Sequence, residues 1–285
     1  ELKKSGRCVM GAYYLTALKY PDKEKWYMYQ VFDSASNILI SGMKLMEHSY
    51  ILNSYTNYIT QKLYYNPAHV IWLCDYHDRV SPDDITWEDV VRVEVKKEEK
   101  KLNKHLCVLY VNFDKKEYFS IRKILEFLGE DLIKNLGTEK QSKYVKFVLY
   151  KGKLYSRIIH PLPFLTNSES EYAGGGDYHG EYPLRGYWAK DLIVALPDGA
   201  EPIIHKYGFE DISKDVLVEV ENNCLNTPKD VLTFYLLKLM KDFNVVNNPS
   251  QFFLKWYSTK SPNEYYITFP RVNEKKVIEI LKSFS

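Results

Sequence analysis

With 285 residues, the chain is long enough for one large domain, or for one domain and a smaller companion. Its 39 basic and 37 acidic residues leave a net charge of +2. A charge this small excludes strong electrostatic attraction of the whole molecule to nucleic acid or to an anionic membrane, but it allows a local basic patch. No apolar run approaches the ~18 residues of a membrane span, so we expect no membrane association. The 25 tyrosines suit strands and wet interfaces, although an AT-rich genome would also enrich them.

The cysteines indicate a reducing compartment. Cys8, Cys74, Cys107 and Cys224 form no CxxC pair, and two of the four sit inside apolar runs. Buried free thiols therefore fit better than a disulfide framework or a zinc site. We expect an intracellular, cytoplasmic protein, and the sequence assigns it neither a cofactor nor a set of metal ligands.

The first 66 residues predict a hairpin and a helix. Strands at 8–18 and 25–33 flank a turn and should pair antiparallel, and a short strand can follow at 38–40. A helix with helically spaced apolar residues follows Ser49, its predicted cap, and stops at Asn66 before a proline.

The middle of the chain alternates buried strands with helices and polar turns. The charged run 96–104 is interpreted as a solvated turn in preference to a binding patch. The expected elements are strands at 68–74, 90–95 and 106–112, helices at 120–128 and 131–136, a hairpin of 145–150 with 153–159, and strands at 186–196, 203–207 and 216–220.

Residues 226–285 have a pattern of their own. A helix from Pro228 to Met240, strands at 252–257 and 265–269, and a closing helix at 274–284 are expected. The predicted fold is therefore α+β: a mainly antiparallel sheet domain over 1–222, and a small helix–strand–strand–helix domain or appendage over 226–285.

One stretch concentrates the candidate chemistry. His160 precedes Pro161 and should be held extended, and Gly174, Gly175, Gly176 and Asp177 follow further on. The glycines could let backbone amides meet an anion, but no helix pattern follows them, which favours a tight or flexible turn. No P-loop, GxGxxG, GxSxG or HExxH motif is present.

Histidine and aspartate pairs suggest an alternative, catalytic interpretation. Asp177 and His179 would share one face of an extended segment, and Asp75 with His77 repeats the pair at a strand end. With His48, these segments could form a cluster for metal-assisted or general acid–base hydrolysis, provided that they meet in space. The predicted catalytic set is His48, Asp75, His160 and Asp177.

A ligand surface is a second candidate. It would combine aromatic and basic side chains to bind a base or a nucleotide. The favoured interpretation of the same residues is a strand with a buried tryptophan and a lysine whose charged end reaches the solvent. The predicted ligand-binding residues are Gly174, Gly175, Gly176, Tyr178, His179, Arg185 and Trp188.

Several blocks between residues 40 and 195 carry a resemblance. They are Lys44–Ser49 with Asn53, Trp72–Tyr76, Val111–Asn112 with Lys115–Tyr118, His160–Pro163, Gly174–Tyr178 and Trp188–Asp191. In these blocks the chain resembles uncharacterised proteins of bacteria and their phages, except that Cys74 stands where glycine is expected before Asp75. The resemblance implies a phage or mobile-element origin, with the virion or the host cytoplasm as its location.

The leading functional prediction is a binding or interaction protein that acts with a protein partner in a larger assembly. It depends on the lack of a catalytic signature, the tyrosine content and the balanced charge. The alternative is a hydrolase of nucleotides or phosphoesters, and a third possibility is nucleic-acid binding through a local basic surface. The sequence does not indicate an oligomeric state.

Overall fold

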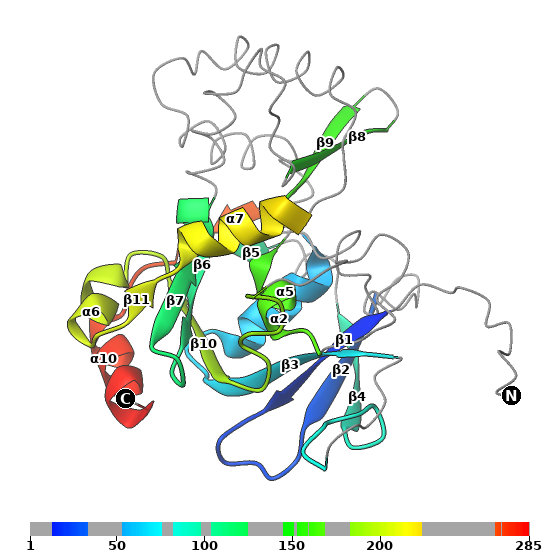
Figure 1. Ribbon diagram of the computed structural model, residues 1–285, viewed down its shortest axis with the longest axis horizontal. Helices are drawn as coiled ribbons and strands as arrows, with labels where there is room; N and C mark the ends of the chain where they lie inside the picture. Colours follow the sequence, from blue (N-terminus) through cyan, green and yellow to red (C-terminus); the bar gives the residue numbers. More distant parts are fainter. Residues whose placement is uncertain are drawn as a thin grey trace, which may run out of the picture.

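The computed structural model places a mixed sheet at the centre of the protein, with helices against it (Figure 1). The structure describes residues 13–33, 53–75, 82–97, 104–124, 145–150, 153–158, 160–168, 183–223, 266–268 and 270–284.

Eight strands form the central sheet. Its five inner pairings are antiparallel, and only the two outermost pairings, β11 with β7 and β2 with β4, are parallel. The predicted α+β class is therefore confirmed. In spatial order the strands are β11 (Glu210–Asp211), β7 (Glu117–Ser120), β6 (Val108–Asn112), β10 (Leu192–Pro197), β3 (Ala68–Cys74), β1 (Tyr14–Lys19), β2 (Tyr27–Asp33) and β4 (Val91–Lys97).

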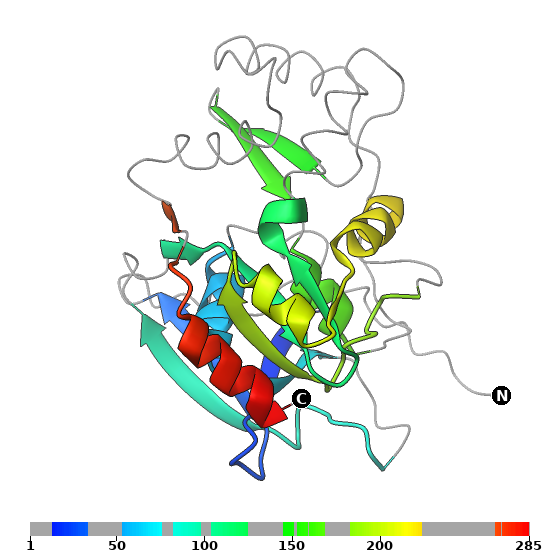
Figure 2. The same cartoon turned by 90° about the vertical axis from the view of Figure 1, so that its left-hand side faces the viewer.

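The middle strands are apolar on both sides because both faces of the sheet are covered. Alternate residues of β6 enter two separate cores: Val108 and Tyr110 pack in one, Leu109 and Val111 in the other. Along the first face lie α2 (Ser54–Leu63) and α5 (Pro161–Thr166), and the second core includes residues of α6 (Glu201–Lys206) and α10 (Glu274–Phe284). Figure 2 shows α6 and α10 lying next to each other in front of the sheet.

Helix α2 begins at a cap other than the predicted one. The side chain of Asn53 accepts hydrogen bonds from the backbone N–H groups of Tyr55, at 2.8 Å, and Thr56, at 3.0 Å. These bonds satisfy two of the donors that a helix start leaves unpaired. The predicted cap, Ser49, lies outside the described residues.

Two predicted strands are wrong. Residues 203–207 fall mostly in α6, and 216–220 lie within α7 (Ser213–Asn223). In α7 Val216 and Leu217 are buried while Val218 is 47% exposed, which fits a helix with one buried face. The segment was predicted as a strand because it is rich in residues with a high strand propensity. In these two segments, packing against the rest of the protein outweighs the local strand propensity, and both form helices.

Two boundaries also differ from the prediction. Residues 117–120 form β7, where a turn and a helix start were predicted, and a helical turn begins only at Ile121. The strand predicted from Gly186 begins at Leu192, because residues 183–190 are turns. Gly186 has φ +68°, and a Cβ there would lie 2.7 Å from the carbonyl oxygen of Asn167, so the turn requires glycine.

Other predictions are confirmed. The first hairpin pairs Ala17 with Met28, and β8 (Val145–Tyr150) pairs antiparallel with β9 (Lys153–Ile158). The strand at 68–74 and the closing helix, α10, have the predicted bounds.

The C-terminal part is described only at its end. There, β12 (Tyr266–Thr268) pairs parallel with β5 (Lys104–Leu106), and Val277 and Leu281 of α10 are buried in the second core. The predicted helix 131–136, the helix from Pro228 and the strands at 38–40 and 252–257 lie outside the described residues. The division into domains 1–222 and 226–285 stays a prediction.

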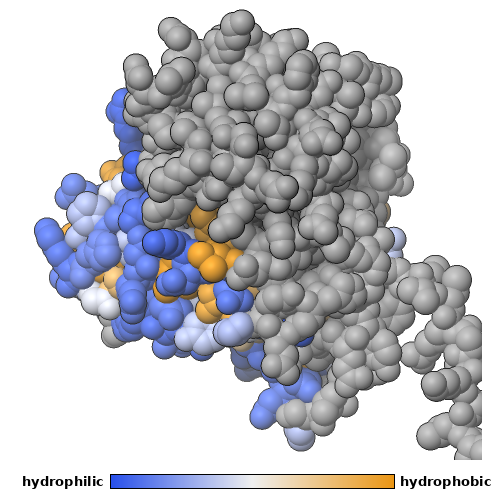
Figure 3. Space-filling model, turned by 45° about the horizontal axis from the view of Figure 1, so that its top comes forward, coloured by the Kyte–Doolittle hydropathy of each residue, from blue (hydrophilic) through white to orange (hydrophobic). Residues whose placement is uncertain are grey.

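One face of the described part of the protein is mostly polar. Figure 3 shows hydrophilic residues over most of the described part of one face, with a small apolar area among them. No helix in the described part of the chain has the length and apolar character needed to cross a bilayer.

Candidate functional site

The structure describes two of the four predicted catalytic residues. Asp75 and His160 are placed by the structure, whereas His48 and Asp177, like His77, lie outside the described residues. The structure therefore tests what Asp75 and His160 contact, and the convergence of all four stays a prediction.

Asp75 follows the last residue of β3 and is exposed. Its Oδ1 accepts a hydrogen bond of 3.0 Å from the backbone N–H of Tyr13 and one of 3.8 Å from the thiol of Cys74. Asp75 thus extends the pairing of β3 with β1 by one side-chain contact at the sheet end.

His160 is 3% exposed and caps α5. Its backbone is extended, at φ −80° and ψ 123°, as predicted for a residue before proline. The ring Nδ1 accepts a hydrogen bond of 3.1 Å from the backbone N–H of Leu162, and Nε2 lies 3.2 Å from the hydroxyl of Tyr110. Both ring nitrogens are therefore engaged inside the protein.

The hydrogen bonds around His160 have one consistent direction. Because Nδ1 is an acceptor, the neutral ring carries its proton on Nε2 and donates it to the oxygen of Tyr110. Tyr110 then donates to Thr60 Oγ1 at 2.7 Å, since the Thr60 hydroxyl itself donates to the carbonyl of Thr56 at 2.8 Å. Burial raises the pKa of Tyr110, which keeps its hydroxyl protonated. This chain links α5, β6 and α2 and has the form of a structural contact.

The predicted ligand surface is described at Arg185 and Trp188 only; Gly174, Gly175, Gly176, Tyr178 and His179 lie outside the described residues. Trp188 is fully buried, and its Nε1 donates a hydrogen bond of 2.9 Å to Glu117 Oε2. Its ring is consequently not presented for stacking on a base. Arg185 is half-buried in the turn that precedes Trp188.

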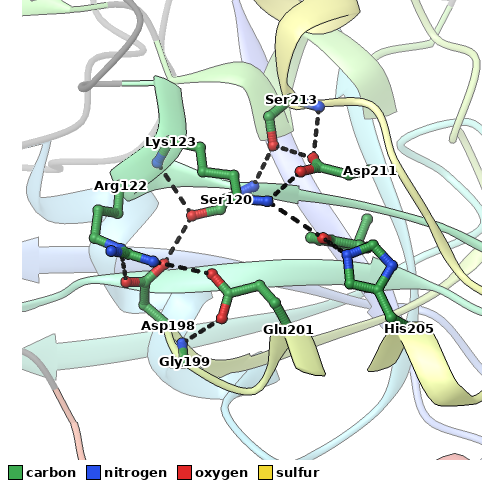
Figure 4. Close-up of polar contacts among 10 residues, drawn as sticks. Ser120, Arg122, Lys123, Asp198, Gly199, Glu201, His205, Asp211 and Ser213 are labelled. Atoms are coloured by element: carbon green, nitrogen blue, oxygen red, sulfur yellow. Dashed lines mark hydrogen bonds and ion pairs between the residues drawn. The ribbon is translucent and has the colours of Figure 1, made fainter. Parts of the chain in front are cut away.

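A dense group of charged and hydroxyl side chains lies at the β11 edge of the sheet, a group to which no sequence motif pointed (Figure 4). We call it the edge cluster; it comprises Ser120, Arg122, Lys123, Asp198, Glu201, Asp211 and Ser213. Its members come from the end of β7 and the helical turn after it, from the turn before α6 and the first residue of α6, and from the β11–α7 junction. The edge cluster therefore joins three segments that are distant in sequence.

Lys123 and Asp211 form the ion pair at one end of the edge cluster. Ser213 donates to Asp211 Oδ1 from its hydroxyl, at 2.5 Å, and from its backbone N–H, at 3.0 Å. Burial on its own would raise the pKa of Asp211, but the hydrogen bonds from Lys123 and Ser213 outweigh it, and the pKa is lowered. Burial opposes the charge of Lys123, yet Asp211 raises its pKa overall.

Asp198 is the centre of the other end. It accepts a hydrogen bond of 2.7 Å from the hydroxyl of Ser120 and pairs with Arg122, which also contacts Glu201 at 3.4 Å. Burial raises the pKa of Asp198, and the negative charge of Glu201 adds to the rise; Ser120 and Arg122 offset only part of it.

The edge cluster lacks the arrangement of a nucleophile and its base. The hydroxyls of Ser120 and Ser213 each donate to a carboxylate, while the nearby imidazole of His205 contacts the hydroxyl of Tyr118 at 2.8 Å. Burial raises the pKa of Tyr118 to about 12, which removes it as a base near neutral pH. Among the described residues, no three His, Cys, Asp or Glu side chains are grouped to hold a metal ion.

The opposite edge of the sheet, at β4, has a different character. The backbone N–H of Val91 donates to the carbonyl of Trp26, at 2.9 Å, so Val91, Val93 and Val95 direct their backbone groups toward β2. Because the direction alternates along a strand, the backbone groups of Arg92 and Glu94 point away from the sheet. No strand in the described ranges pairs with this outer side.

The side chains of β4 alternate as the sequence predicted. Val93 and Val95 pack against the first core, Val91 is 37% exposed, and Arg92 and Glu94 are exposed on the other face. The guanidinium of Arg92 lies 5.9 Å from the ring centre of Trp87. The alternation predicted a half-buried strand, but its place at the sheet edge depends on strand order, which the alternation does not encode.

Comparisons of the chain with protein-family models, with curated proteins and with solved structures give no match. A functional assignment therefore depends on the chemistry of the residues described above.

Proposed function

We propose that the protein is a binding protein that acts within a larger assembly, and that the outer edge of β4 is its contact surface. The observation that carries the proposal is the seven-residue edge strand with outward-pointing backbone groups and exposed charged side chains. Unpaired edge strands of this length are templates for strand addition, one of the general modes of protein recognition.

The hydrolase alternative has less support from the described residues. A general base needs a nitrogen or a carboxylate oxygen within hydrogen-bonding reach of substrate. Both ring nitrogens of His160 are engaged in the interior, and Asp75 accepts the Tyr13 backbone N–H. The resemblance to proteins of bacteria and their phages supports a phage or mobile-element origin, with the assembly in a virion or in the host cytoplasm.

Affinity purification after cross-linking in the native cell tests the proposal. The variant Glu94→Pro removes an outward N–H without touching the hydrogen bonds to β2, so we expect cross-linked partners to be lost from it. The matched control is Glu279→Lys on the exposed face of α10, which should retain them. Equal recovery of the same partners by wild type and Glu94→Pro would remove β4 as the contact surface.

A hydrolysis assay addresses the alternative. Wild type, Asp75→Asn and His160→Asn are incubated with a phosphodiester or a nucleoside triphosphate, in the presence of Mg²⁺, Mn²⁺ or Zn²⁺. We expect no turnover that distinguishes the three proteins. Turnover by wild type that disappears in both variants, with unchanged circular dichroism, would establish the hydrolase instead.

A further inference from the structure

The outer edge of β4 is complementary to itself in one antiparallel register. When two copies of the strand run antiparallel with Val93 opposite Val93, Arg92 of each copy stands opposite Glu94 of the other. Both opposite-charge pairs then lie on the same exposed face. On the other face, Val91 of each copy stands opposite Val95, so apolar meets apolar.

The backbone groups agree with the same register. In an antiparallel ladder, residues that exchange two hydrogen bonds must both direct N–H and C=O toward the partner. Arg92 and Glu94 do so, because the backbone groups of Val91 face β2 and the direction alternates. The Val93 pair is then a close, non-hydrogen-bonded pair, in which side chains approach most nearly.

Neighbouring registers are less favourable. Centring the two strands on Arg92 or on Glu94 sets like charges directly opposite each other. Centring them on Val95 leaves Val91 and Val93 with no valine opposite them. Among these registers, only the one centred on Val93 sets opposite charges against each other and valine against valine throughout residues 91–95.

We propose that the partner at this edge is a second copy of the chain, joined by antiparallel β4–β4 pairing about a twofold axis that passes between the two Val93 residues. This inference rests on the proposed binding function and names the partner. The pairing would join two eight-stranded sheets into one continuous sheet, and it gives an isologous contact, in which the same residues serve both copies. The net charge of +2 imposes little repulsion between the copies.

The charges of Arg92 and Glu94 are available for this contact. Both side chains are exposed, and neither forms an ion pair with another residue in the part of the chain that the structure describes. Arg92 lies over Trp87 on its own subunit, which holds the guanidinium near the strand. Pairing would therefore satisfy backbone and side-chain groups together.

Sedimentation equilibrium of the full chain, as a function of concentration, tests the proposal by charge reversal. Wild type should form a dimer. In Arg92→Glu or Glu94→Arg, twofold symmetry turns both attractive pairs into repulsive ones, and we expect dimerisation to weaken about ten- to a hundredfold. The double variant Arg92→Glu/Glu94→Arg restores both pairs in reversed order and should dimerise like wild type.

Glu279→Lys, a charge reversal on exposed α10, should leave the dimer unchanged, and all variants should keep the circular dichroism of wild type. A wild type that is monomeric at every concentration, single variants that dimerise normally, or a double variant no better than the single ones would overturn the pairing. If wild type is monomeric but the cross-linked partners still depend on β4, only the identity of the partner fails and the binding function stands.

Discussion

The two edges of the sheet differ in whether their charged side chains are paired within the chain. The β11 edge is a two-residue strand tied to its surroundings by the edge cluster, in which Lys123, Arg122 and their carboxylates are paired. The β4 edge is a seven-residue strand whose exposed charges have no ion-pair partners among the described residues. Since an open edge strand is a template for pairing, this contrast is what motivates the proposal that β4, and not β11, is the contact surface.

Proline substitution should give the largest difference within the β4 edge. Val93→Pro removes an N–H that faces β2, and we expect it to lower the free energy of unfolding by about 3 kcal/mol or more. Glu94→Pro removes an N–H that faces outward and should cost about 1 kcal/mol or less in the monomer. Urea denaturation of both variants, at a concentration at which the protein is monomeric, measures the difference; similar losses would mean that the outer side of β4 is paired within its own chain.

Breaking the ion pair of the β11 edge should have a smaller effect. Asp211→Ala removes the partner of Lys123 and the acceptor of two hydrogen bonds from Ser213, and it should cost about 2 kcal/mol, because the pair is partly screened by solvent. The matched control, Glu210→Ala, alters the exposed neighbour on the same strand and should stay within about 0.5 kcal/mol.

The cost of Asp211→Ala should depend on pH. The pKa of Asp211 is lowered in the folded protein, so its contribution is complete above the ordinary value of about 3.9 and is lost as the pH falls below it. Wild type and Asp211→Ala should therefore converge in stability under acid conditions. A difference that stayed constant with falling pH would show that the carboxylate charge contributes nothing at this edge.

Asp198→Asn should have the smallest effect and the opposite pH dependence. The pKa of Asp198 is raised, so its stabilising contribution is present below the ordinary value of about 3.9 and is lost as the pH rises through the folded value. At neutral pH the variant should differ from wild type by about 1 kcal/mol or less, because the raised pKa means that the fold favours the neutral carboxyl, which the amide of Asn resembles, over the charged one. As the pH falls, wild type should gain stability relative to the variant, which thermal denaturation at several pH values can follow.

Sequence patterns predicted several buried strands and the closing helix. Continuous apolar runs located β3 and β6, and the predicted closing helix has the bounds of α10, where Val277, Ile280 and Leu281 are buried. The same reasoning failed for α6 and α7, because short helices rich in isoleucine and valine have the composition of strands.

The sites were less predictable because they depend on contacts between distant segments. Pro161 predicted the extended backbone of His160 but not its contact with Tyr110, fifty positions earlier in the chain. The edge cluster joins Ser120 to Asp198, seventy-eight positions apart, so no short sequence motif could predict it. Position at a sheet edge likewise follows only from strand order.

The parallel pairing of both outermost strands has a consequence for how the chain folds. Ala17 pairs with Met28, eleven positions away, so the first hairpin can form early, whereas Tyr27 must wait for Val91, sixty-four positions later. Glu117 and Glu210, paired between β7 and β11, are ninety-three positions apart. Closing such long loops is slow because their entropy is lost before any contact compensates for it. We therefore expect β2 to be exposed as a temporary edge during synthesis until β4 has emerged, and β6 to join β3 only after β10, the strand between them, has emerged.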